Sequence, residues 1–339
     1  MKKLPLIEWL NLLGNSIHQL INRLQKLLQI VFWKFQGQGI YHRNRRKFKE
    51  YGWSLTGTSV NWGDLLLREI ADEFFDLVTI RKEYAGAVFG GSVLSEYHFE
   101  HFQKNTSSRP VLAVSCGARN SRESLEPPLN LEIHGVRGHC TAALLKNTVP
   151  TGDPGMLAPI IFGIEPKLSN EFRKLHVPHY SQPKNRIDFH AESLSTMLPF
   201  GKSSKSLVSK INSSNFVLAG SLHAGICAFA CGTPFAFSLA DSSEDTFKFY
   251  DFAQFYGINI VFQEDFKSAI RWYLNEDTLH LDRAPKDFEI YSSSLSEYVK
   301  YDLNIFRSKV EIHIKSRKSI HALKVKSLTD YLKRGKLIS

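Results

Sequence analysis

The segment from Phe216 to Pro234 constrains the fold more than any other part of the chain. It reads F-V-L-A-G-S-L-H-A-G-I-C-A-F-A-C-G-T-P, so a short apolar run passes through Gly-Ser-Leu-His into a small-residue helical pattern that Gly232 and Pro234 close. This pattern predicts a strand, a turn and a helix. In an open α/β fold such a turn lies at the carboxyl edge of a sheet, where Ser221, His223 and the first amides of the helix would suit an anion such as phosphate.

The rest of the 339-residue chain supports an α/β fold, because short β-rich runs alternate with helical patterns from about Ser54. Expected strands are the run ending at Val60 and residues 78–80, 86–89, 111–115, 131–136, 160–164, 175–178, 187–190, 216–219, 235–237 and 258–262. Expected helices cover residues 65–75, 141–146, 206–212, 222–231, 266–273 and 320–332. The alternation predicts a parallel, doubly wound arrangement in two Rossmann-like domains, residues 51–170 and 171–280. Residues 1–50 and a basic helical tail, 281–339, flank them.

The net charge of +10 is concentrated at the N-terminus, where residues 1–49 carry ten lysines and arginines against Glu8. The remaining residues are nearly neutral as a whole, which argues against a long groove for nucleic acid. Apolar residues recur every three or four positions from Leu6 to Phe35 and predict an amphipathic helix. Polar residues interrupt this segment too often for it to span a membrane. With the basic cluster that follows, it fits an anchor on an anionic membrane surface; a helix packed on the body or on a second subunit fits equally well. We therefore expect a cytoplasmic protein, either soluble or peripheral on the inner membrane face.

Cysteines and histidines give no metal signature. The four cysteines form no C-x-x-C pair, and His176 and His179 lack further ligands nearby in the sequence. Buried thiols in a reducing compartment are expected, and no metal or cofactor is required. Neither G-x-G-x-x-G nor a P-loop is present.

Each candidate site residue follows the end of an apolar run. Asn61, Gly63 and Asp64 open a helix, and capping explains the two polar ones equally well. Gly90 and Gly91 allow close approach of a ligand to the backbone, although glycines end many strands. Arginine suits bidentate capture of phosphate or carboxylate, but is more often solvated. The other candidates are Gly117, Arg119, Arg137, Gly138, Asp153, Ser221, Leu222 and His223.

Taken in order, these motifs resemble the polysaccharide pyruvyl transferase family. The resemblance rests on N-W-G-D at 61–64, G-G-S at 90–92, G-A-R at 117–119, V-R-G at 136–138, T-G-D-P at 151–154, V-P-H-Y at 177–180 and S-L-H-A-G-I-C-A-F-A-C-G-T-P from Ser221. It covers about Ser54 to Phe262. It implies a fold similar to GT-B glycosyltransferases, and an enzyme that moves the pyruvyl group of phosphoenolpyruvate onto two hydroxyls of a sugar, as a cyclic ketal, with release of phosphate.

The resemblance also implies roles for particular residues. His223 matches the family's key histidine and Arg137 its anion-binding arginine, whereas Ser221 stands where some members carry arginine. Pyruvyl transfer requires an acid for the methylene carbon, cations for carboxylate and phosphate, and a base for the hydroxyl. We expect His223 as the acid, Arg137 as the clamp, helped by backbone amides or Arg119, and Asp64 as a candidate base. The acceptor would be a sugar of a polysaccharide or lipid-linked oligosaccharide.

Two other classes of function remain open from the sequence. A glycosyltransferase of the same fold would hold the diphosphate of a nucleotide sugar at the helix start after Ser221. A non-catalytic protein that binds glycans or a membrane surface would have no use for intact Arg137 and His223.

Overall fold

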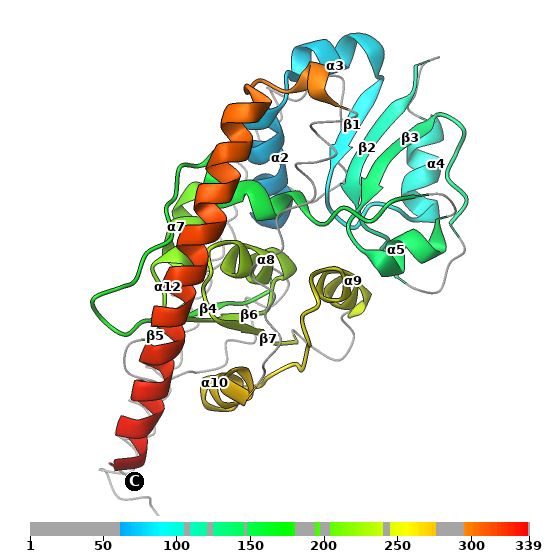
Figure 1. The fold of residues 1–339 in the computed structure, drawn as a ribbon. Coiled ribbons are helices and arrows are strands. Elements are labelled where there is room, and N and C mark those ends of the chain that lie inside the picture. Colours follow the sequence, from blue (N-terminus) through cyan, green and yellow to red (C-terminus); the bar gives the residue numbers. More distant parts are fainter. Residues whose placement is uncertain are drawn as a thin grey trace, which may run out of the picture.

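The computed structural model describes residues 62–104, 109–120, 125–145, 148–179, 194–196, 204–239, 245–275 and 295–337 (Figure 1). The predicted amphipathic helix and basic cluster of residues 1–49 lie outside these ranges. So do the expected strands that end at Val60 and cover residues 187–190.

A three-stranded parallel sheet forms the first part of the fold, in the order β1 (Gly86–Phe89), β2 (Val111–Cys116), β3 (Leu131–Val136). Its register pairs Gly86 with Val111 and Val111 with Leu131. All six residues of β2 are buried, as expected of a central strand whose two faces are covered. Helices α4 (Glu96–Lys104) and α5 (His139–Leu144) lie beside this sheet in Figure 1.

A four-stranded parallel sheet forms the second part, in the order β5 (Leu194–Thr196), β4 (Lys174–Val177), β6 (Phe216–Ala219), β7 (Phe235–Phe237). Residues of β6 alternate between two cores. Val217 and Ala219 pack with α7 (Ser204–Asn212) and α8 (Leu222–Ala230), whereas Phe216 and Leu218 pack with α10 (Phe266–Asn275). Successive residues of a strand point to opposite faces of the sheet, and both faces of β6 are covered by helices. All four residues of this strand are therefore apolar.

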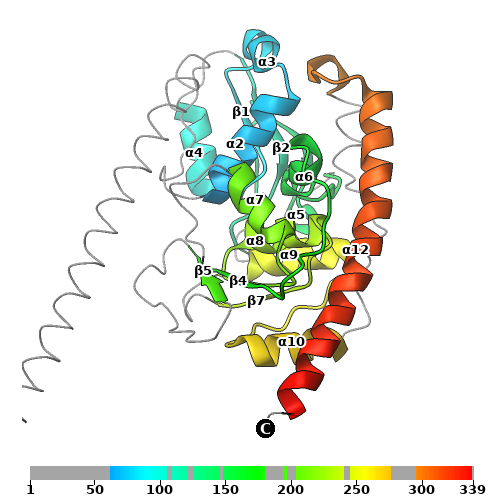
Figure 2. The same cartoon turned by 90° about the vertical axis from the view of Figure 1, so that its left-hand side faces the viewer.

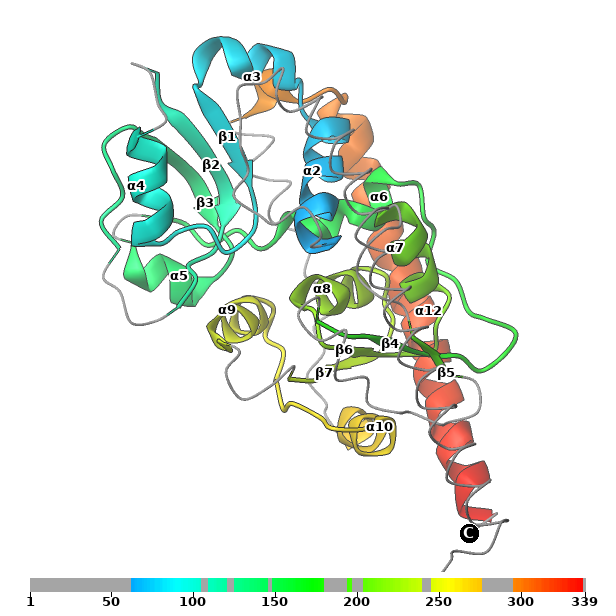
Figure 3. The same ribbon diagram turned by 180° about the vertical axis from the view of Figure 1, so that it is seen from behind.

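Helix α2 (Trp62–Phe74) joins the two parts, because its first turns contribute Trp62 and Leu66 to the core of the second sheet and its end contributes Phe74 to a core with Leu112 of β2. Figure 3 shows α2 between β1 and α8. The 35-residue helix α12 (Leu303–Leu337) also runs past both sheets and lies at the edge of the molecule in Figure 2. Its Phe306 enters the core with Leu112, and its Leu328 enters the core with Phe216.

The remaining elements are short and connect these parts. They are α3 (Leu77–Glu83), the 3-10 helix η1 (Pro154–Leu157), α6 (Ala158–Ile161), α9 (Phe247–Tyr256) and the 3-10 helix η2 (Ser296–Tyr298).

The predicted α/β class and parallel sheets are confirmed, and β1, β3, β6 and β7 have the predicted bounds. Three expected strands are wrong. Residues 78–80 lie in α3, because the Asp76 side chain accepts hydrogen bonds from the amides of Val78 and Thr79 and caps a helix there. Residues 160–164 contain the end of α6 and a turn at Gly163, whose φ is +62°. Residues 258–262 form no strand.

Sequence periodicity also missed two helices, α4 and α9, and the first half of α12. The division into two Rossmann-like domains of the GT-B type stays a prediction.

Candidate active site

His223 lies in the first turn of α8, directly after β6, where the sequence placed it. Its side chain is nearly buried and packs against the backbone of Gly63 in the first turn of α2. A Cβ at position 63 would lie 2.1 Å from His223 Nδ1. The glycine of the N-W-G-D motif is therefore required by the close approach of the imidazole.

Asp153 approaches the other nitrogen of the same ring. Its Oδ2 lies 3.7 Å from His223 Nε2, and its Oδ1 accepts a hydrogen bond of 2.9 Å from the Gly155 amide. Asp153 is the N-cap of η1 and is fully buried. Its Oδ2 accepts no hydrogen bond from any described residue. A buried carboxylate oxygen in this position stabilises positive charge on the imidazole.

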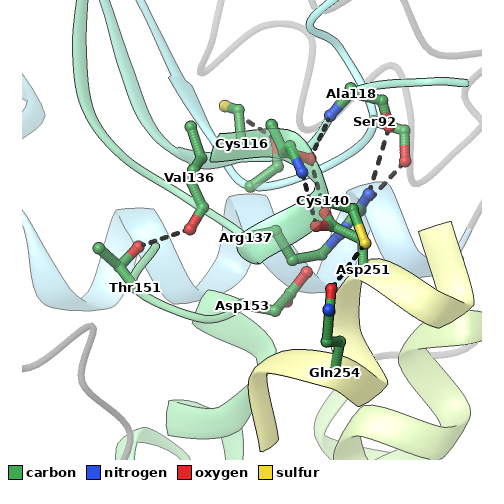
Figure 4. Close-up of polar contacts among 12 residues, drawn as sticks. Ser92, Cys116, Ala118, Val136, Arg137, Cys140, Thr151, Asp153, Asp251 and Gln254 are labelled. Carbon is green, nitrogen blue, oxygen red and sulfur yellow. Dashed lines mark hydrogen bonds and ion pairs between the residues drawn. The ribbon is translucent and has the colours of Figure 1, made fainter. Parts of the chain in front are cut away.

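Arg137 follows β3 and is completely buried, so it is not the solvated arginine that was the alternative to a clamp; its predicted role as the anion clamp stays a prediction. Its Nε lies 3.3 Å from Asp251 Oδ2, its Nη1 donates to Ser92 Oγ at 3.1 Å, and its Nη2 donates to the Ala118 carbonyl at 3.4 Å (Figure 4). The guanidinium thus ties together the ends of all three strands of the first sheet and helix α9.

Asp251 of α9 is the centre of this network. Its Oδ1 accepts from the Thr141 amide at 2.9 Å, and its Oδ2 accepts from Thr141 Oγ1 at 2.6 Å. Thr141 Oγ1 in turn accepts from the Ala118 amide at 3.0 Å. Every oxygen of this buried carboxylate therefore has a partner, which is the condition for a buried ion pair to be tolerated.

Two further motif glycines make room for this network. A Cβ at Gly117 would overlap the Arg137 guanidinium, and one at Gly138 would overlap the Asp251 backbone. These glycines were predicted to contact substrate. The structure gives both a packing reason, and their contact with substrate stays a prediction.

The ends of β2 and β3 are distorted beside these residues. Ser115 has a φ of +52° and Gly135 a φ of +77°, so both strands leave regular geometry just before Cys116 and Val136 pair again. A serine in the left-handed region costs about 1 to 3 kcal/mol and persists only where its surroundings hold it. Here Ser115 Oγ lies 2.9 Å from Thr151 Oγ1.

Cys116 reports the electrostatics of the region. Burial raises the pKa of its thiol to about 12, with Arg137 lowering this pKa and Asp153 raising it. The thiol therefore feels the charges of both Arg137 and Asp153. Burial likewise raises the pKa of Cys227 well above its ordinary value, and Asp153 adds to that effect. The charge of Asp153 therefore acts on thiols of both parts of the fold, Cys116 in the first sheet and Cys227 in α8.

The structure also describes most of the other predicted residues. Ser221 is the N-cap of α8 but makes no side-chain capping bond, and Leu222 beside it is buried. Gly90 and Gly91 have φ values of +66° and +80° and turn the chain after β1. Arg119 is exposed. Asn61 and the side chain of Asp64 lie outside the described residues.

Asp251 and Thr141 were not predicted from the sequence, and Ser92 was noted only as part of the G-G-S motif, without a role of its own. Asp251 lies 114 residues from Arg137, in a helix whose neighbours are aromatic. One signal was present, since an acid among the aromatic residues of F-K-F-Y-D-F-A-Q-F-Y needs a buried partner.

Within the described ranges, no three histidine, cysteine or acidic side chains gather as metal ligands. In that same part of the chain no helix is long and apolar enough to cross a membrane.

The fold and site define an α/β protein whose parallel strands end at a buried histidine–carboxylate pair and a buried arginine–carboxylate pair. Residues 23–242 match the family described as polysaccharide pyruvyl transferase, and the chain belongs to that family. Its members are transferases that act in polysaccharide synthesis. The predicted resemblance is confirmed.

Two other comparisons add little. No curated protein matches the chain. A crystal structure of an uncharacterized protein from Klebsiella pneumoniae is similar over 67% of this chain and 99% of its own, with 13% sequence identity and a TM-score of 0.39. A likeness at that level carries no argument about the site.

Proposed function

We propose that this protein transfers the pyruvyl group of phosphoenolpyruvate to two hydroxyls of one sugar, with His223 as the proton donor. The observation that supports this most is the placement of the imidazole, which lies at a helix start, against Gly63, and 3.7 Å from the buried carboxylate of Asp153. A histidine next to a carboxylate can carry a proton at neutral pH and deliver it to carbon.

The proposed reaction consists of proton transfer to carbon, attack by two hydroxyls and loss of phosphate. The imidazolium of His223 gives a proton to the methylene carbon of phosphoenolpyruvate, which becomes a methyl group, and positive charge develops on the adjacent carbon. One sugar hydroxyl attacks that carbon, phosphate leaves with the electrons of its C–O bond, and the second hydroxyl closes the ketal. Of the two hydroxyl protons released, one restores the imidazolium and the other leaves on hydrogen phosphate.

Asp153 would act through His223 rather than on the substrate. The distance of 3.7 Å is longer than a hydrogen bond, but the charge of the carboxylate still stabilises the imidazolium before proton transfer.

The donor phosphate would lie at the start of α8. Ser221 has no capping bond, so its hydroxyl and the first amides of this nine-residue helix suit an anion. Arg137 would contribute to the site mainly by holding the neighbouring strand ends in place. Its charge is balanced by Asp251, and an anion could use only those N–H groups that Asp251, Ser92 and Ala118 leave. The proposed clamp is therefore the helix start, with Arg137 holding the strand ends that border it.

The test compares His223→Gln with His134→Gln, a half-buried histidine on β3, in release of phosphate from phosphoenolpyruvate with lipid-linked oligosaccharide acceptors. We expect His223→Gln to bind the donor in calorimetry but to lose turnover by about 10²-fold or more, and the control to keep it. Full turnover in His223→Gln would remove this residue from the mechanism. Binding of a nucleotide sugar without binding of phosphoenolpyruvate would instead indicate a glycosyltransferase.

A further inference from the structure

Helix α12 carries a second concentration of positive charge that the net charge of the chain conceals. The residues after position 49 sum to only +1, but α12 contains ten lysines and arginines against Glu311 and Asp330, a net charge of +8. The rest of that region is therefore negative by seven charges. The sequence-based view that the excess lies only at the N-terminus was incomplete, because acidic residues elsewhere cancel the charge of this helix.

The exposed side of α12 is organised in two rows, which we call the α12 outer face. Lys315, Lys326 and Lys333 form one row, and all three are exposed. Their spacings of eleven and seven residues bring them to nearly the same angle around a helix of 3.6 residues per turn.

Beside the lysines runs a row of apolar residues with the complementary spacings of seven and eleven. Ile305 is 60% exposed, Ile312 is 66% exposed and Leu323 is 47% exposed. Side chains of this type normally lie on the buried side of a helix. A cationic row next to an exposed aliphatic row is typical of helices that lie in a membrane interface.

The opposite side of α12 is fixed to the protein. His313 Nε2 lies 2.8 Å from the Ala230 carbonyl at the end of α8, and Lys324 Nζ donates to the Asn212 carbonyl at 2.6 Å. Phe306 and Leu328 are buried in two different cores. The outer face is thus presented along a helix about 50 Å long that is attached over most of its length. Figure 2 shows this helix at the edge of the molecule.

We propose that the α12 outer face docks the protein on an anionic bilayer surface. Lys315, Lys326 and Lys333 would attract anionic headgroups, and the aliphatic row would enter the interface beside them. A nucleic acid would use the cations but would gain little from exposed isoleucine and leucine, which is why we assign a bilayer. This surface is distinct from residues 1–49 and from the proposed transfer site.

The test is sedimentation of the full chain with phosphatidylcholine vesicles that either contain or lack phosphatidylserine. The key variant carries Lys315→Gln, Lys326→Gln and Lys333→Gln. At about 1 kcal/mol per cation, it should bind anionic vesicles roughly 10²-fold more weakly. The matched control removes three exposed lysines from other elements, with Lys205→Gln, Lys210→Gln and Lys267→Gln, and should bind nearly as the parent does.

A second variant tests the aliphatic row. Ile312→Ser with Leu323→Ser should weaken vesicle binding by a similar factor at low and high salt, because the apolar contribution is not screened, whereas the loss in the lysine variant should shrink as salt rises. Four results would overturn the proposal. The first three are a parent protein that does not sediment with anionic vesicles, equal losses in the α12 variant and the control, and tighter, lysine-dependent binding to duplex DNA than to vesicles. The fourth is unchanged binding of the α12 variant, which would assign the docking to residues 1–49.

Discussion

Replacement of Gly63 by alanine should damage the site through a single methyl group. The added Cβ would lie 2.1 Å from His223 Nδ1, whereas ordinary contacts begin at 3.4 Å, so the imidazole must move by about 1.3 Å or α2 must shift. A displacement of about 1 Å in a reacting group can reduce turnover by roughly 10²-fold. We expect a loss of that order in kcat, with a smaller change in donor binding.

Helix propensity alone would predict that Gly63→Ala is favourable, so a harmful effect would have to come from the overlap with His223. Alanine in a helix is favoured over glycine by about 1 kcal/mol, so without the overlap the substitution would stabilise α2. The assay is phosphate release with phosphoenolpyruvate and acceptor, together with thermal unfolding. Gly163→Ala serves as a control, because a Cβ there meets nothing within 4 Å and only the backbone conformation, at a φ of +62°, is strained. Gly63→Ala with unchanged turnover would refute the inferred contact between α2 and the reacting imidazole.

Two further substitutions test the buried charges. Asp251→Asn leaves the Arg137 guanidinium buried without its counter-charge and should lower the free energy of unfolding by about 3 to 5 kcal/mol, measured by denaturant titration; a change below about 1 kcal/mol would contradict the buried ion pair. Lys324 has its pKa lowered to about 8 by burial, so its burial costs stability below pH 8 and this cost disappears as the pH rises toward the pKa of an unfolded lysine, near 10.4. Unfolding measured across that range should show stability rising with pH relative to Lys324→Met, and parallel curves would contradict the shift.

The sequence predicted those parts of the fold that local patterns specify. Strand β6 and helix α8 follow from an apolar run, a glycine turn and a small-residue helix, and all three appear where expected. The strand predicted at residues 78–80 was wrong because the Asp76 cap, two residues before this β-branched run, starts a helix there. The strand predicted at residues 160–164 was wrong because an apolar run of that length fits a buried helix as well as a strand.

The candidate site divides in the same way. His223 was identified because its motif is contiguous, and Asp153 because it begins a recognisable turn. Their approach to within 3.7 Å was not predictable, since it depends on how η1 packs against α8. Asp251 was missed for the same reason: only the packing of α9 against α5 shows that its carboxylate balances Arg137.

The attachment of α12 to both cores has a consequence for synthesis. Helix α12 is translated after all the other described elements, and the chain emerges from the ribosome at about 5 to 20 residues per second. Until Phe306 and Leu328 arrive, the core around Leu112 and the core around Phe216 are both incomplete. Neither sheet can therefore bury its apolar face fully until α12 has emerged. A ribosome that stalls before residue 303 would expose these surfaces to chaperones, and final closure of the two sheets should be a single event that waits for this helix.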